Sequence, residues 1–285
     1  MTMRVFSTSL AELSLNSATV REQWGLAQAI EGCARHGIAG IAPWRDQLHA
    51  LGVEEGARRI GDAGLRVSGY CRGGMFPAAD GAGRQAAIED NRRAIDEAAA
   101  IAAECLVLVA GGMPPGSKDL PGARAQVRDG IAAILPHARA AGVPLAIEPL
   151  HPMYAADRCV ISTLAQALDL CEELDPDGSH QLGVAIDVYH VWFDPALESE
   201  VARAGAGGRI LAFHVCDWLV PTRDLLLDRG MMGDGVIDIR RIRGLVEGAG
   251  YDGLVEVEIF SRLDWWQRDP EEVLRVVSER HRTVV

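Results

Sequence analysis

Four apolar segments in the second half of the chain each end in a side chain that can bind a metal ion. Glu148 ends LAIE, Asp187 ends VAID, His214 ends LAFH and Glu258 ends VEVE. Taken singly, each has an ordinary explanation, such as a solvated carboxylate or a hydrogen-bonded core histidine. Together they do not, because a buried ionised carboxylate needs a compensating charge and neighbouring carboxylates repel one another. A divalent cation removes both difficulties, so we expect one to bind here.

The chemical character of these four side chains narrows the choice of metal. Three carboxylates and one imidazole form a hard, oxygen-rich ligand set, whereas structural zinc sites prefer Cys and His. The set favours Mn²⁺ first, then Mg²⁺, and is compatible with Co²⁺ or Fe²⁺. We therefore predict one divalent ion, with water or substrate oxygens completing its coordination shell.

The elements that must position these residues follow a repeated pattern. Eight short apolar runs suit strands buried on both faces of a parallel sheet, and they lie at 4–10, 37–44, 65–71, 105–112, 143–150, 182–190, 209–218 and 254–260. Helical patterns lie between and after them, at 19–37, 53–64, 83–102, 123–142, 162–174, 194–207, 238–250 and 269–280. The repeated βα unit predicts an α/β fold, a single (β/α)8 TIM barrel domain over residues 1–285. An open doubly wound sheet is the alternative, but no GxGxxG follows the first strand.

The first helix carries recognisable start and stop signals. Thr19 is the expected N-cap, Glu22 would complete a capping box, and Gly37 would end the helix. In a TIM barrel the active site lies at the carboxyl ends of the strands. The four candidate ligands end strands five to eight of the prediction, so they should converge at the barrel mouth.

His190 lies three residues after Asp187 in the stretch AIDVYH. Side chains alternate along a strand, so these two residues would not share a face if the strand continued. His190 reaches the same cavity only if the chain turns directly after Asp187. We predict that it does, and that His190 contacts substrate rather than the metal.

The pattern resembles the xylose-isomerase-like barrel superfamily, and within it the sugar phosphate isomerase/epimerase group of ketose 3-epimerases, hydroxypyruvate isomerases and inosose dehydratases. Glu148, Asp187, His214 and Glu258 match that group's Glu–Asp–His–Glu metal site, and His190 matches the substrate-contacting histidine of the ketose epimerases. The resemblance implies an enzyme that is a metal-dependent isomerase or epimerase of a keto-sugar or related polyol. Such an enzyme removes the proton beside a metal-chelated carbonyl and passes through an enediolate.

The catalytic groups of this reaction would be two carboxylates and an imidazole. Glu148 and Glu258 would flank the substrate as proton-transfer groups, and His190 would orient a substrate oxygen. Tyr154 stands where ketose 3-epimerases carry a second glutamate, and Arg223 is the nearest candidate for the arginine that follows their metal histidine. The same first step also serves a lyase or dehydratase, which remains the alternative activity.

The other residues expected at the barrel mouth are candidates for substrate binding, namely His151, Tyr154, Asp217, Arg223 and Trp44. Aromatic side chains there could stack on a sugar face, pack under a lid or form a subunit interface. The expected partner is a small-molecule carbohydrate, and a homo-oligomer is left open.

The charge balance argues against several other functions. The chain carries 40 Asp and Glu against 28 Lys and Arg, a net charge of −12, whereas nucleic-acid binders present a basic surface. This argues against nucleic acid, against an anionic membrane and against the abasic-DNA endonucleases of the same superfamily. Lys118 is the only lysine and lies in a Gly/Pro-rich stretch, which disfavours a Schiff-base aldolase. A non-catalytic sugar-binding subunit stays open.

The cellular compartment is suggested by the cysteines and the N-terminus. The six cysteines show no CxxC spacing and are expected to be reduced and mostly buried. The N-terminus has no signal-peptide core, and no apolar run approaches the roughly 18 residues needed to span a membrane. We therefore expect a cytoplasmic protein.

Overall fold

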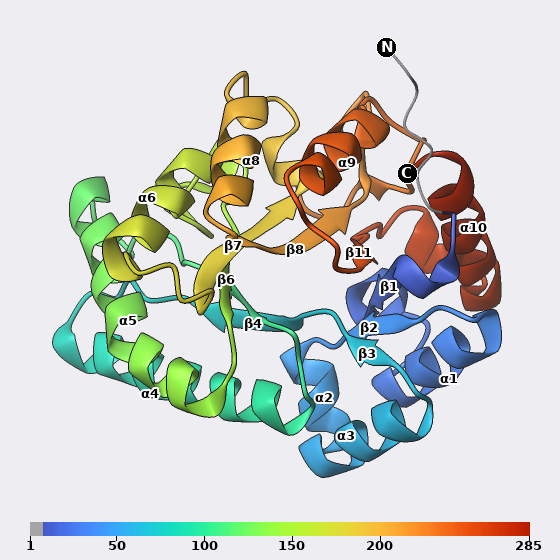
Figure 1. Ribbon diagram of the computed structural model, residues 1–285, viewed down its shortest axis with the longest axis horizontal. Coiled ribbons are helices and arrows are strands. Elements are labelled where there is room, and N and C mark those ends of the chain that lie inside the picture. Colours follow the sequence, from blue (N-terminus) through green and yellow to red (C-terminus); the bar gives the residue numbers. More distant parts are fainter. Residues whose placement is uncertain (1–7) are drawn as a thin grey trace.

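The computed structural model describes residues 8–285, and its centre is a parallel sheet curved into a nearly closed barrel (Figure 1). The order of hydrogen-bonded strands is β3-β2-β1-β11-β8-β7-β6-β5-β4. All neighbours in this sheet pair in parallel. The strands are β1 Leu13–Asn16, β2 Gly40–Ala42, β3 Arg66–Val67, β4 Tyr70–Gly74, β5 Leu106–Val109, β6 Leu145–Ile147, β7 Leu182–Asp187, β8 Ile210–Val215 and β11 Val255–Val257.

Strands β3 and β4 share one position in the barrel. β3 pairs with β2, and β4 pairs with β5. Two isolated β-bridges complete the ring of strands. Trp44, after β2, bridges to Cys71 of β4, and Val67 of β3 bridges to Ala103, before β5. The nine segments thus fill eight barrel positions, and the predicted (β/α)8 barrel is confirmed.

The helices lie around the outside of the sheet (Figure 1). They bury one apolar face against it, as α5 does with Val127, Ile131 and Ile134 at the spacing typical of an amphipathic helix. Their bounds are α1 Leu26–His36, α2 Arg45–Leu51, α3 Val53–Asp62, α4 Gly81–Ala100, α5 Leu120–Ala141, α6 Leu164–Leu174, α7 Val188–Val191, α8 Leu197–Ala206, α9 Ile239–Gly248 and α10 Pro270–Thr283. Short 3-10 helices lie at Leu10–Glu12, Ser17–Val20, Pro152–Tyr154 and Trp265–Gln267, and an antiparallel ribbon pairs β9 Asp217–Trp218 with β10 Arg229–Gly230.

The predicted N-terminal elements are wrong in position. The strand predicted at 4–10 overlaps residues 1–7, which lie outside the described residues, and the barrel strand is instead Leu13–Asn16. The first helix begins after Gly25 rather than at Thr19. Thr19 lies in a 3-10 turn, where its hydroxyl donates to the Val257 carbonyl and accepts the Ile259 N–H. Thr19 thus connects the segment after the first strand to the last strand. Of the signals predicted for this helix, the stop at Gly37 is confirmed.

Two further features of the structure concern the cysteines and the membrane-spanning character of the helices. All six cysteines are free and buried, as predicted. Between residues 8 and 285, no helix combines the length and the apolar character needed to cross a membrane.

Candidate metal centre and active site

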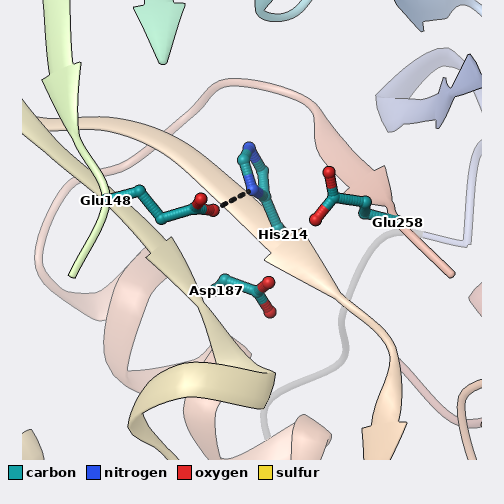
Figure 2. Close-up of side chains that lie close together, drawn as sticks. All are labelled: Glu148, Asp187, His214 and Glu258. Carbon is teal, nitrogen blue, oxygen red and sulfur yellow. Dashed lines mark hydrogen bonds and ion pairs between the residues drawn. The ribbon is translucent and has the colours of Figure 1, made fainter. Parts of the chain in front are cut away.

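The four predicted ligands come together at the carboxyl ends of four neighbouring strands (Figure 2). Glu148 follows β6, Asp187 ends β7, His214 lies near the end of β8 and Glu258 follows β11. One ligand atom from each lies within 4.8 Å of the others, and all four residues are buried. In Figure 2 the three carboxylates and the imidazole point toward one centre.

The period-two alternation of the strands explains this convergence. Residues two positions earlier share the inward face, and they are the small buried side chains Ala146, Ala185 and Ala212, followed by the acidic Glu256. Small side chains leave room above them at the mouth of the barrel. Each strand therefore presents its last inward side chain to the same cavity.

The arrangement fits a divalent ion. Two ligands that each lie about 2.2 Å from one ion are at most roughly 4.4 Å apart, so only a slight contraction of the 4.8 Å cluster is needed. The Nδ1 atom of His214 lies 3.0 Å from Oε1 of Glu148. The donor set is the hard, carboxylate-rich one that the sequence predicts.

Arg229 is a site residue that the sequence did not reveal. It is buried, and its Nη1 atom lies 3.1 Å from Oδ2 of Asp187 and 3.2 Å from Oε2 of Glu258. The guanidinium also lies over the rings of Tyr189 and Phe260, with centroid distances of 4.4 Å and 5.0 Å. This arginine compensates part of the carboxylate charge.

Asp217 and Arg223 hold the loop that carries Arg229, and neither lines the cavity. The carboxylate of Asp217 accepts the backbone N–H groups of Gly233 and Ile237, which fixes the turn after β10. Arg223 is half exposed and pairs with Asp228, the neighbour of Arg229. The arginine that contacts the cluster is therefore Arg229, whereas Asp217 and Arg223 stabilise the loop that carries it.

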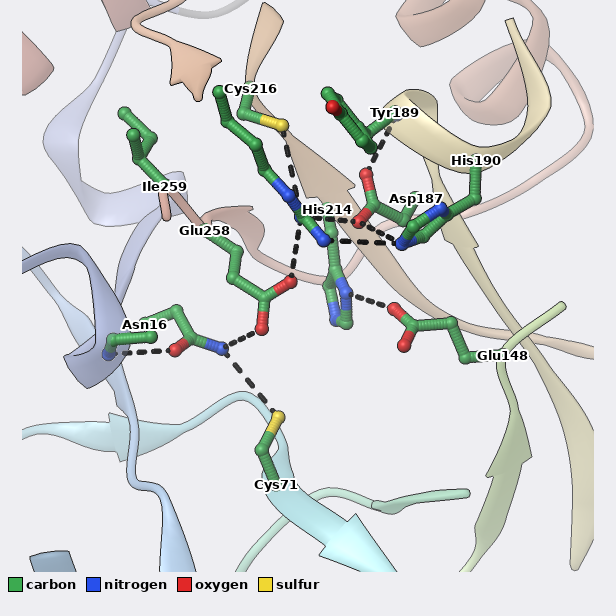
Figure 3. A network of polar contacts seen from close by, with 12 residues as sticks. Asn16, Cys71, Glu148, Asp187, Tyr189, His190, His214, Cys216, Glu258 and Ile259 are labelled. Atoms are coloured by element: carbon green, nitrogen blue, oxygen red, sulfur yellow. Dashed lines mark hydrogen bonds and ion pairs between the residues drawn. The ribbon is translucent and has the colours of Figure 1, made fainter. Parts of the chain in front are cut away.

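Glu256 is a second site residue that the prediction omitted, and Figure 3 shows the network around its neighbours Asn16 and His214. Glu256 accepts hydrogen bonds of 2.7 Å from the amide of Asn16 and the hydroxyl of Ser68. Its Oε1 atom lies 3.5 Å from Nε2 of His214. Nδ1, which contacts Glu148, is the His214 nitrogen that faces the cluster, and the carboxylate of Glu256 lies beside Nε2. The same amide of Asn16 also donates to Glu258, at 3.1 Å.

Burial and mutual repulsion change the protonation of this cluster. Burial raises the pKa of Glu258 to about 8, with Arg229 opposing and the charge of Glu148 adding to the shift. Burial likewise raises the pKa of Asp187 to about 6. Burial would lower the pKa of His214, but the carboxylates of Glu256 and Glu148 outweigh it and raise that pKa well above its usual range. Protons therefore stay in the cluster where an ion would displace them.

His190 occupies the position predicted for it, because the chain turns into α7 directly after Asp187. Its Nδ1 atom accepts the backbone N–H of His151 at 3.2 Å. Its Nε2 atom lies 3.2 Å from Nη2 of Arg229 and 3.7 Å from Oδ2 of Asp187. Burial, together with the positive charge of Arg229, lowers the pKa of His190 well below its usual value. The imidazole is therefore neutral.

A pocket opens beside the cluster. It is lined by Trp44, Cys71, Arg72, Val107, Val109, Glu148, Leu150, Tyr154, Arg158, His190, Leu226, Arg229, Glu258 and Phe260. Trp44 and Tyr154 thus lie where the sequence placed them. The hydroxyl of Tyr154 donates to the Leu225 carbonyl, while His151 packs against Phe193 and Trp218 outside this lining.

The first prediction concerns the metal. Asp187→Asn should lower metal occupancy by at least about tenfold while the barrel stays folded, because the variant loses one anionic ligand. Metal content after dialysis, read beside the far-ultraviolet circular dichroism spectrum, measures the effect. Asp175→Asn is the matched control, since Asp175 is also a buried carboxylate but lies before β7, paired with Arg139. That control should lose melting temperature and keep its metal; full occupancy in Asp187→Asn would refute the site.

The second prediction concerns pH. Carboxyl groups whose pKa is raised on folding stabilise the metal-free protein below their unfolded pKa of about 4, and this stability is lost as pH rises through about 6 for Asp187 and about 8 for Glu258. Metal binding needs both groups deprotonated. The gap in melting temperature between metal-loaded and chelator-treated protein should therefore widen as pH rises over this interval. A gap that stays constant would contradict the assignment.

Comparisons with known proteins agree with the fold and the site geometry. The xylose isomerase-like TIM barrel family matches residues 30–277. An inosose isomerase of Halalkalibacterium halodurans is 26% identical over 145 residues, which are 48% of this chain and 46% of that protein. The match thus spans about half the length of this curated relative.

Two solved structures extend the comparison over nearly the whole chain. Protein SMc04130 of Sinorhizobium meliloti 1021 is 60% identical, with a TM-score of 0.94 over 97% of this chain and 99% of that one. The IolI protein, whose structure contains a bound zinc atom, is 19% identical, with a TM-score of 0.80 over 94% of this chain and 95% of its own. The second likeness shows a shared fold.

Proposed function

This chain belongs to the xylose isomerase-like TIM barrel family, and on that basis we propose that it is a divalent-metal-dependent isomerase or epimerase of a keto-sugar or related polyol. The observation that carries the proposal is the placement of Glu148 and Glu258. Both belong to the carboxylate–imidazole cluster, both line the pocket, and they are the outer members of the four, with β7 and β8 between their strands. A substrate in the pocket would have one carboxylate on each side.

The chemistry needs a weakly acidic C–H bond to be broken beside a carbonyl group. A divalent ion held by Glu148, Asp187, His214 and Glu258 would supply the electrophilic polarisation that acidifies this bond. One glutamate removes the proton, and the other returns a proton on the opposite face. Return to the same carbon gives epimerisation, and return to the neighbouring carbon gives isomerisation.

Other side chains would orient the substrate for this transfer. The neutral His190 lines the pocket and can contact a substrate oxygen, and Arg229 can donate from a guanidinium that also contacts Glu258. Trp44, fixed by its indole N–H to Asn16, offers an aromatic face along one wall of the pocket. The similarity to inosose isomerases supports a keto-polyol or keto-sugar as the substrate class.

Elimination begins with the same proton removal, so a lyase is the chemical alternative. It requires an acid that protonates the leaving group. Tyr154 already donates its hydroxyl proton to Leu225, and His151 lies outside the pocket lining. Neither residue is aimed at the substrate, so the geometry favours isomerisation or epimerisation.

Metal analysis followed by solvent-deuterium exchange tests the proposal. Purified protein should contain close to one divalent ion per chain, and Mn²⁺ should restore activity after chelation. In D₂O the metal-loaded protein should introduce deuterium into a member of a panel of ketoses, keto-inositols and 3-keto-glycosides. A dehydrated product would identify a lyase. A metal-loaded protein that exchanges no hydrogen with any of them would be a non-catalytic binding protein.

A further inference from the structure

Two of the arginines that line the active-site pocket form no ion pair with a carboxylate of the described residues. Arg72 lies in β4, and Arg158 follows the 3-10 helix Pro152–Tyr154. Both side chains face the pocket that also contains Glu148 and Glu258. Across residues 8–285 neither guanidinium forms an ion pair or a side-chain hydrogen bond, and the Nε atom of Arg158 is buried without a partner.

This lack of partners is unusual for a partly buried arginine of this chain. Arg45, near the same mouth, pairs with Asp90 and Glu97, and Arg229 pairs with two carboxylates of the cluster. Acidic residues outnumber basic ones by 40 to 28, so carboxylates are plentiful. The fold nevertheless leaves these two cations unpaired at the pocket.

The arrangement is unfavourable until an anion arrives. A partly desolvated guanidinium without hydrogen-bond partners destabilises the protein. Burial lowers the pKa of Arg72, and the positive charge of Arg158 lowers it further, which shows that the two cations repel one another. Arg158 is nevertheless held in place, with its guanidinium 5.7 Å from the centre of the Tyr154 ring. Two unpaired guanidinium groups that line one pocket, close enough to repel one another, form a receptor for anionic oxygens.

We propose that the substrate carries a carboxylate or phosphate group, which Arg72 and Arg158 bind while the reacting carbonyl lies at the carboxylate–imidazole cluster. The inference rests on the proposed function and specifies its substrate class as an anionic keto-sugar. The apolar wall formed by Leu150 and Leu226 would cover the carbon chain between the two ends. Neutral ketoses would leave both guanidinium groups unpaired.

Three ketohexoses that differ only at carbon six test this inference: D-fructose, D-fructuronate and D-fructose 6-phosphate. Binding to the Mn²⁺-loaded protein is measured by calorimetry, and hydrogen exchange in D₂O is measured separately. At least one anionic sugar should bind roughly 10- to 100-fold more tightly than fructose, the range expected for charge-assisted hydrogen bonds. The stronger of the two identifies carboxylate or phosphate as the natural group.

Variants then assign the preference to the two arginines. Arg72→Gln and Arg158→Gln should each bring the ratio of anionic-sugar affinity to fructose affinity most of the way back to one. Arg72→Lys and Arg158→Lys keep the charge and should retain part of it. Arg275→Gln is the matched control, because Arg275 is exposed on α10 and outside the pocket. Melting temperatures establish that each variant is folded.

The outcomes separate this inference from the proposed function. Equal or undetectable binding of all three sugars overturns the anion site, as does a preference that survives in both glutamine variants. Exchange with fructose but no anionic preference overturns the anion site alone. An anionic preference without exchange in any sugar supports the anion site and counts against the isomerase.

Discussion

Glu258→Gln should lower the rate of substrate hydrogen exchange by at least ~10³-fold, within the range for loss of a positioned acid–base group. Glutamine keeps an oxygen that can contact an ion but cannot accept a proton at neutral pH. Glu148→Gln should have an effect of similar size. The two carboxylates are the outer members of the cluster, so each would serve one face of the substrate.

If the enzyme is an epimerase, the two variants should affect the deuterium exchange of the two epimers differently. Each epimer should lose deuterium exchange in one variant more than in the other, because each presents its hydrogen to a different glutamate. Mass spectrometry of each recovered epimer after incubation in D₂O measures this, with metal content determined on the same samples. Retention of full exchange by both metal-loaded variants would exclude the glutamates as proton carriers.

His190→Asn should reduce turnover by at least ~10²-fold while metal content and melting temperature stay unchanged. Asparagine can still accept the His151 N–H that Nδ1 accepts now, but it does not reach the position of Nε2 beside Arg229. His190→Gln places an amide nitrogen near the Nε2 position and should recover part of the rate. This pair separates orientation of the substrate from support of the loop.

Two results would contradict this role. A His190→Asn protein without metal would make His190 a ligand, since its Nε2 lies only 3.7 Å from Asp187. Unchanged activity in both variants would reduce His190 to a packed histidine bonded to the backbone.

The strand-end cluster was predictable because each of its members interrupts an apolar pattern at the same place in a βα repeat. Glu256 obeys the same rule, since it lies two residues before Glu258 and must share its face. Arg229 was not predictable, because it lies in a long loop that also contains Arg223. Which arginine turns inward depends on Asp228, which pairs with Arg223. It also depends on the rings of Tyr189 and Phe260, which lie against Arg229.

The first strand was missed for a physical reason as well. Its inward face carries Ser14 and Asn16, which bond to Ser68 and Glu256 inside the barrel. A strand with polar residues on one buried face has no continuous apolar run, so its sequence does not indicate burial. The polar partners that make this favourable are supplied by distant strands.

The contacts of Arg229 bear on how the protein could be reconstituted in vitro. Its guanidinium, with the amide of Asn16, supplies counter-charge and hydrogen bonds to Asp187 and Glu258, so the barrel does not depend on an ion to neutralise its mouth. We therefore expect chelators to strip the protein without unfolding it. Different divalent ions could then be introduced into the finished barrel one at a time, and the ion that a preparation contains would reflect the medium in which it was loaded.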